Sequence, residues 1–325
     1  MNAAWFFGLL LIIQPINPSE NLMIENQGEM ITSINRLDYT MSFPGIPLID
    51  LEKYNAFIKE LDEQTYKPPV NAYINDLGRV IEGEPGRKLY RKAFNDLFYT
   101  YFYKTNASRV EVPMLPIYPK IDRDLLLRIY VKPIGQYVTY FNRNNTARSH
   151  NITLASEAIN NYVIFPGEKF SFNQVVGKRT KEKGYMRAPV IVRGELSEDI
   201  GGGICQVSST LFNAADRAGL KMVERYSHSK NVPYVPPGRD ATVSWYGPDF
   251  SFINEYSLPI LIRSKVLGGQ MIIQLFSSDE IDYEPRQVPS TKNVPQQEIQ
   301  SEKETINKIS SSSLHLYTNA FDREN

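Results

Sequence analysis

The first third of the chain alternates between helical and extended patterns. Apolar residues at every third or fourth position predict helices over residues 51–64 and 89–104. Residues 70–89 predict two short strands around a turn at Leu77–Gly78. Prolines within residues 109–121 exclude a helix and favour an edge strand. These elements predict a small mixed unit of helices and strands.

The second half is richer in strands. Residues 135–152 begin as an alternating strand and end in a polar loop, and residues 152–165 predict a short helix that runs into a strand. Two β-rich runs around Gly268 and Gly269 predict a hairpin. Further short strands are predicted over residues 220–229, 241–247 and 251–256.

One clear helix follows the glycine run GGGIC and ends before Gly219. Its apolar stripe is formed by Val207, Leu211, Ala214 and Ala218. Away from that stripe lie Cys205, Ser209, Phe212 and Asp216. This second side is expected either to be covered as well or to line a cleft.

The pattern as a whole predicts an α+β protein: a largely antiparallel sheet domain with one central helix after GGGIC, and a smaller α+β module before it. The expected boundaries are a leader over residues 1–30, the first module over 31–135, the sheet domain over 136–277 and a tail over 278–325. The tail is polar and short of large apolar residues, which predicts disorder.

The apolar run over residues 3–13 has the length of the hydrophobic part of an export signal and is too short to span a bilayer. It lacks the usual basic flank, so a buried strand is the alternative. The leader predicts an extracytoplasmic protein of the cell envelope, secreted or associated with the membrane through residues 3–13.

The amino-acid composition excludes several kinds of partner and site. Lys and Arg total 36 and Asp and Glu total 36, so no basic excess predicts a nucleic-acid partner. A single cysteine excludes an internal disulfide and cysteine-rich metal sites. The three histidines, His150, His228 and His315, are far apart in sequence and form no zinc motif. We therefore expect no metal and no cofactor.

The candidate chemistry centres on Cys205. A cysteine in the first turn of a helix lies near the positive end of the helix dipole, which favours the thiolate. A cysteine nucleophile requires a base, for which His228 is the best candidate, with Asp240 as the carboxylate that orients it. The alternative is a small, buried and inert cysteine with glycines packed around it.

A ligand-binding role is predicted for the residues around this centre. The three glycines would let the backbone approach a ligand closely or form a nest of N–H groups for an anion. Arg225, Tyr226 and Arg239 would bind an anionic group. The complete predicted set is Gly201, Gly202, Gly203, Gln206, Ser208, Ser209, Arg225, Tyr226 and Arg239.

Several segments resemble the VanW family, named for an accessory protein of vancomycin-resistance clusters. They are FPGEKFSFNQVVGKRT, KGYMRAPVIVRGEL, GGGICQVSSTLFNAADRAGL, VERYSHSKNVPYVPPGRDATV and GPDFSFIN, in the family's order across about residues 150 to 265. Ser209 and Phe212 depart from the threonine and tyrosine frequent in the family. Residues 51–121 resemble, more loosely, the peptidoglycan-binding module that precedes VanW domains and some L,D-transpeptidase domains.

The resemblance implies a protein that binds or acts on peptidoglycan or its peptide precursors, linked to glycopeptide resistance or to wall remodelling. It supplies no mechanism. Two hypotheses follow: an accessory protein that binds wall material without chemistry, and a cysteine-dependent peptidase or transpeptidase that uses Cys205, His228 and Asp240. The distance between the Cys205 sulfur and the His228 ring separates them.

Overall fold

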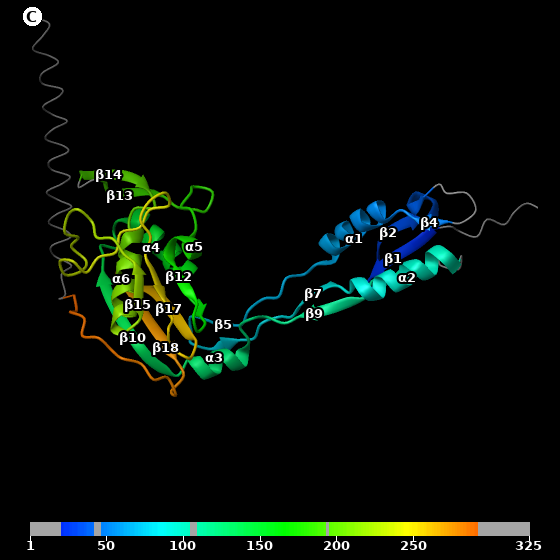
Figure 1. Ribbon diagram of the computed structural model, residues 1–325. Helices are drawn as coiled ribbons and strands as arrows, with labels where there is room; N and C mark the ends of the chain where they lie inside the picture. The colour runs from blue at the N-terminus through cyan, green and yellow to red at the C-terminus, as the bar shows by residue number, and fades with distance from the viewer. Residues whose placement is uncertain (1–20, 42–46, 105–108, 193–194, 292–325) are drawn as a thin grey trace, which may run out of the picture. The chain divides into compact units, whose positions relative to one another are not determined.

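The computed structural model describes residues 21–41, 47–104, 109–192 and 195–291, and it confirms the α+β class with mostly antiparallel sheets (Figure 1). The chain forms two compact units. The first comprises Met1–Ala72 and Glu82–Asp122, and the second comprises Tyr73–Ile81 and Arg123–Asn325. The leader segment over residues 3–13 lies outside the described residues.

The first unit packs two helices against a small sheet. The predicted helices are confirmed as α1 (Leu51–Thr65) and α2 (Arg91–Lys104), and the Asp50 side chain caps α1 by accepting a hydrogen bond from Lys53 N. Their aromatic faces form the core with Tyr54 and Phe98, whose ring centroids are 4.2 Å apart. The strands of this unit are β1 (Asn21–Asn26), β2 (Glu29–Asn35), β3 (Thr40–Met41), β4 (Leu48–Ile49), β7 (Gly86–Leu89), β8 (Arg109–Glu111) and β9 (Met114–Ile117), with a 3₁₀ turn η1 (Arg36–Tyr39).

Residues 21–30 differ from the prediction of a leader over 1–30. They form β1 and the start of β2, and β1 pairs antiparallel with β2 and parallel with β8. Leu22 and Ile24 are fully buried in the core of this unit. The alternation of buried and exposed positions in NLMIEN is too short to distinguish from a leader by pattern alone.

The second unit is built on an antiparallel sheet with the strand order β10–β18–β17–β11. These strands are β10 (Lys132–Tyr140), β11 (Val163–Ile164), β17 (Ile260–Leu267) and β18 (Gln270–Ser277). The predicted hairpin is confirmed by β17 and β18, which pair from Leu261 to Leu267. Helices α4 (Thr146–Ile159) and α6 (Ile204–Arg217) pack against the sheet and against each other.

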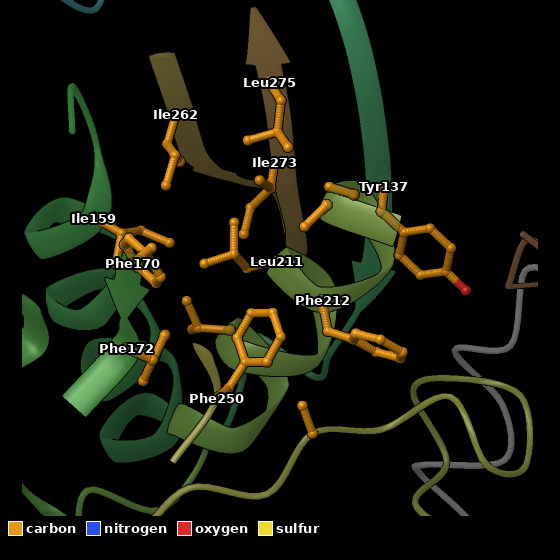
Figure 2. Packing of buried hydrophobic residues seen from close by; sticks show 14 of the residues in the cluster. Tyr137, Ile159, Phe170, Phe172, Leu211, Phe212, Phe250, Ile262, Ile273 and Leu275 are labelled. Carbon is orange, nitrogen blue, oxygen red and sulfur yellow. The ribbon is translucent and has the colours of Figure 1, made fainter. Parts of the chain in front are cut away.

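Strand alternation explains this packing. Met271, Ile273 and Leu275 of β18 are fully buried, and the residues between them are only partly buried. Leu211 of α6 packs with Ile273 in the same core (Figure 2). The apolar stripe predicted for α6 therefore faces the sheet.

A second sheet, β12–β16–β15, adds an aromatic layer to this core. Its Phe170 and Phe252 rings stack with centroids 5.0 Å apart, and Phe250 lies 5.6 Å from Phe252. The remaining elements are β5 (Tyr73–Ile74), β6 (Val80–Ile81), α3 (Arg123–Ile129), β12 (Lys169–Ser171), α5 (Phe172–Val176), β13 (Arg187–Val192), β14 (Glu195–Ile200), β15 (Lys221–Glu224) and β16 (Ser251–Ile253).

The start of the predicted tail is packed. Residues 278–291 have no regular secondary structure, yet Ile281 and Val288 are buried. Arg286 donates to Asp216 at 3.0 Å, and the Tyr137 hydroxyl donates to the Pro289 carbonyl at 2.9 Å. This segment differs from the predicted disorder because single apolar side chains and hydrogen bonds hold it, which composition does not reveal. Residues 292–325 lie outside the described residues.

The predicted strand over residues 241–247 is not a strand. Its backbone is bonded by side chains of α6 instead of a neighbouring strand: Ser208 Oγ donates to the Ala241 carbonyl at 2.6 Å, and Ala241 N donates to Ser209 Oγ at 2.9 Å. The same segment lies next to Cys205. Hydrogen bonds from α6, in place of sheet pairing, therefore hold the segment that lies next to the candidate nucleophile.

Candidate functional site

The site begins where β14 turns into α6. Gly203 is the N-cap residue of α6, with φ 104° and no capping side chain. A Cβ atom on Gly202 would lie 2.5 Å from the Ala188 carbonyl oxygen, so only glycine fits against β13. The buried Asn151 amide of α4 donates to the Gly202 carbonyl at 3.0 Å and fixes the turn. These glycines position the first turn of α6 against its neighbours.

Helix α6 is buried on nearly all sides. On its second side, Ser209 and Phe212 are covered and Cys205 is partly buried, and a cleft along this side stays a prediction. Its polar side chains bind the segment that follows residue 238, and Asn213 Nδ2 donates to the Arg239 carbonyl at 2.8 Å. The helix is therefore the frame on which residues 239–243 are held.

Asp240 and His228 form a tight pair on that frame. The Asp240 Oδ2 atom accepts hydrogen bonds from His228 Nδ1 at 2.6 Å and from the His228 backbone N–H at 2.6 Å. The two side chains are 6% and 7% exposed. With Nδ1 bound to the carboxylate, the other ring nitrogen, Nε2, is left for a second partner.

The Cys205 thiol lies near this ring, since His228 and Cys205 each shift the pKa of the other. The sulfur also lies 3.6 Å from the Val243 carbonyl oxygen and 3.8 Å from Thr242 Oγ1. The structure therefore brings together the three residues that the sequence predicted as nucleophile, base and orienting carboxylate.

Charge interactions within this group shift all three pKa values. Burial acts to raise the pKa of Cys205, but hydrogen bonding and charge interaction with His228 lower it below its usual value. Burial acts to lower the pKa of His228, yet its bonds to Asp240 and Cys205 raise that pKa to about 9. Burial acts to raise the pKa of Asp240, but the bonds from His228 lower it. The bonds between these side chains therefore favour their charged forms, a thiolate beside an imidazolium and a carboxylate.

Tyr234 is a residue of the site that sequence reasoning missed. It is buried, and burial followed by interaction with Cys205 raises its pKa well above the usual value, so its hydroxyl stays protonated. The Arg148 guanidinium lies 6.0 Å from the centre of its ring and donates to Gln206 Oε1 at 2.7 Å. Nothing in the sequence pattern around Tyr234 indicated proximity to Cys205.

The side chains predicted to bind a ligand direct their polar atoms into the protein. Arg225 donates to the Asp240 carbonyl at 2.8 Å, and Arg239 donates to Asp216 at 2.7 Å. Both guanidinium groups pack on Phe212, at 4.5 and 4.6 Å from the ring centre. The ligand-binding role of these arginines stays a prediction, and their geometry supports the loop that carries His228.

The other members of that set are similarly engaged. Ser208 and Ser209 bond to residue 241, as described above, and Gln206 Nε2 donates to the Tyr140 carbonyl at 3.0 Å. The Gly201 N–H donates to the Met186 carbonyl at 3.0 Å. Tyr226 differs from them because its side chain is 53% exposed. For all of these residues, contact with a ligand stays a prediction.

Over residues 21–41, 47–104, 109–192 and 195–291, no group of three or more histidine, cysteine, aspartate or glutamate side chains is arranged to hold a metal ion. Within those same ranges, no helix is both long and apolar enough to cross a membrane.

Comparison with known proteins places this geometry in a family. Residues 147–276, which contain the whole Cys205–His228–Asp240 group, match the VanW like protein family. The chain is 57% identical over 295 residues to the Bacillus subtilis (strain 168) protein named "Uncharacterized protein YoaR", an alignment that covers 91% of this chain and 97% of that one.

A second relative matches over a shorter stretch. The chain is 35% identical over 130 residues to the vancomycin B-type resistance protein VanW of Enterococcus faecalis (strain ATCC 700802 / V583), which covers 37% of this chain and 47% of that protein. No solved structure matches. The near full-length relative and the match across the site show that the chain belongs to the VanW family.

Proposed function

We propose that this protein is a cysteine-dependent enzyme of acyl transfer, a peptidase or transpeptidase, that acts on peptide bonds of peptidoglycan or its precursors. The single observation that supports the chemistry is the buried Asp240–His228 pair near the Cys205 sulfur. An inert structural cysteine has no need of a buried, carboxylate-bound histidine beside it.

The geometry suits a thiolate mechanism. The Cys205 thiolate attacks a carbonyl carbon, an S–C bond forms, and the C–N bond breaks as the His228 Nε2 proton passes to the departing amine. Water or an acceptor amine then attacks the thioester and gives its proton back to Nε2, which releases the acyl group and restores the thiolate. Asp240 keeps the ring oriented and stabilises its positive charge throughout.

The substrate and the location rest on other support. The Enterococcus faecalis relative is named as a vancomycin resistance protein. Residues 51–121 resemble a peptidoglycan-binding module. Residues 3–13 resemble an export signal. We therefore place the protein in the cell envelope, with the first unit as the wall-binding module and the second as the catalytic unit.

Alkylation of the folded protein tests the chemistry. We expect iodoacetamide to modify Cys205 rapidly from roughly pH 5 upward, below the ordinary thiol pKa of about 8.5. His228→Gln should remove this low-pH reactivity, whereas Lys230→Gln, a change of an exposed residue in the same loop, should retain it. A thiol that reacts only after denaturation would exclude the nucleophile and leave a wall-binding protein without chemistry.

Activity forms the second test. The wild-type protein should release or exchange amino acids on peptidoglycan peptides, and Cys205→Ala should abolish the reaction while retaining the fold, as judged by circular dichroism. Turnover unchanged in Cys205→Ala would refute the proposal.

A further inference from the structure

Two large aromatic side chains are exposed beside the Cys205–His228–Asp240 group. Trp245 is 41% exposed and Tyr246 is 84% exposed, on a turn that follows Val243 directly. The Val243 carbonyl contacts the Cys205 sulfur at 3.6 Å. Two residues of extended chain span about 7 Å at most, so the backbone of Trp245 lies within a short peptide's length of the nucleophile.

This turn is held in place by several hydrogen bonds. Ser244 N donates to the Pro248 carbonyl at 2.8 Å, which closes the turn. The buried Asn173 amide donates to the Ser244 carbonyl at 2.9 Å and to the Pro248 carbonyl at 3.1 Å. The backbone of this turn is therefore fixed, so a ligand that packs on its two exposed side chains does not have to order the turn.

Neighbouring groups extend the same surface. The Lys178 ammonium lies 5.1 Å from the centre of the Tyr246 ring. A third exposed aromatic, Tyr226, is joined to this segment because Thr242 N donates to the Tyr226 carbonyl at 2.8 Å. The segment that follows Cys205's neighbour Val243 therefore carries exposed aromatic rings with an indole N–H and a phenol hydroxyl, and an ammonium group lies against one of them.

We infer that Trp245 and Tyr246 form a stacking platform for the glycan of the substrate. This inference rests on the proposed function and goes beyond it, because it assigns recognition of a sugar to residues outside the reacting group. A pyranose ring has an apolar C–H face and a rim of hydroxyl and acetamido groups, which matches ring faces bordered by polar donors. The platform would hold the sugar that carries the stem peptide while that peptide reaches Cys205.

Direct binding tests the platform without catalysis. The Cys205→Ala protein is titrated calorimetrically with peptide-free oligomers of the wall glycan. We expect saturable binding that weakens about tenfold or more in a Trp245→Ala/Tyr246→Ala background. Trp245→Phe should retain part of it, and Tyr118→Ala, which removes a 76% exposed tyrosine of the first unit, should not change it. Binding equal in all variants would overturn the inference.

A matched pair of substrates gives an independent test. With Cys205 intact, the double variant should raise KM for a disaccharide-bearing stem peptide by about tenfold and leave KM for the same sugar-free peptide unchanged. An equal loss with both peptides would show that the rings contact the peptide or support the fold, and would refute the glycan platform. Absence of turnover with both peptides in the wild-type protein would refute the proposed chemistry instead. The calorimetric experiment does not require turnover, so it would still decide whether the two rings bind the glycan.

Discussion

Replacing Asp240 with asparagine removes the negative charge that holds His228 while keeping the shape of the side chain. Asp240 Oδ2 accepts two bonds of 2.6 Å from His228, one from Nδ1 and one from the backbone N–H. The net rise of the His228 pKa from 6.5 to about 9 corresponds to about 3 kcal/mol: burial acts to lower this pKa, and the interactions with Asp240 and Cys205 together exceed that effect. In Asp240→Asn the share of Asp240 is lost, while the burial that lowers the His228 pKa persists.

The expected consequence is a less acidic thiol. Without Asp240, the His228 ring loses its proton at a lower pH, and a neutral ring no longer stabilises the Cys205 thiolate. If half of the shift belongs to Asp240, the His228 pKa falls by about one unit, which lowers the imidazolium fraction by up to about tenfold above that pKa and slows alkylation there. The assay is the iodoacetamide rate against pH, with the His228 titration followed by NMR in the same protein.

Asp216→Asn is the matched control. Asp216 also lies partly buried in an ion pair, with Arg239 at 2.7 Å, but it does not contact His228. It should leave the alkylation profile unchanged. If Asp240→Asn leaves both the His228 pKa and the alkylation rate unaltered, the coupling between these three residues is refuted, and with it the thiolate reasoning.

Three further predictions concern the same region. Gly202→Ala should lower the free energy of unfolding by about 1–3 kcal/mol in urea melts, because its Cβ would meet the β13 backbone at 2.5 Å; a loss below a few tenths would contradict the close packing. Asn151→Ala should cost about 2–4 kcal/mol, since its amide makes three bonds to Met186 and Gly202, and an unchanged denaturation midpoint would contradict their role. Catalytic rate against pH should fall on the alkaline side near the His228 pKa of about 9, because the imidazolium must donate a proton. A rate that stays constant through that pH would contradict His228 as the acid.

The same pKa shifts predict the pH dependence of stability. The His228 pKa is raised in the folded state, so its contribution is complete below about 6.5 and is lost as pH rises through about 9. The Cys205 pKa is lowered, so its contribution is lost as pH falls through that lowered value. His228→Gln should therefore lower Tm most at near-neutral pH, and a Tm difference independent of pH would refute the coupling.

Sequence reasoning succeeded where local pattern decides structure. The helices α1, α2 and α6 follow from apolar spacing, and the β17–β18 hairpin follows from two β-rich runs around Gly268 and Gly269. It failed over residues 241–247, whose β-like pattern is overridden by hydrogen bonds from α6. A local sequence pattern does not reveal that side chains of another element will form hydrogen bonds with the backbone of a segment.

The candidate site shows the same division. Residue chemistry singled out Cys205, His228 and Asp240, which the fold places together although they lie more than ten residues apart. Tyr234 and Trp245 were not singled out, because their proximity to the sulfur depends on the path of the loop between β15 and β16. Long-range placement of this kind requires the tertiary structure.

The packed segment over residues 278–291 also has a consequence for solubility. Strand β10 lies at the edge of its sheet, where unpaired carbonyl groups would offer a template for another chain. The carbonyls of Gln136 and Val138 instead accept hydrogen bonds from Arg217 at 2.8 Å and Thr291 at 2.8 Å. Arg217 of α6 and Thr291 after the last strand thus protect the sheet edge, and a chain ended at Ser277 would lose the Thr291 bond and be expected to pair more readily with another chain.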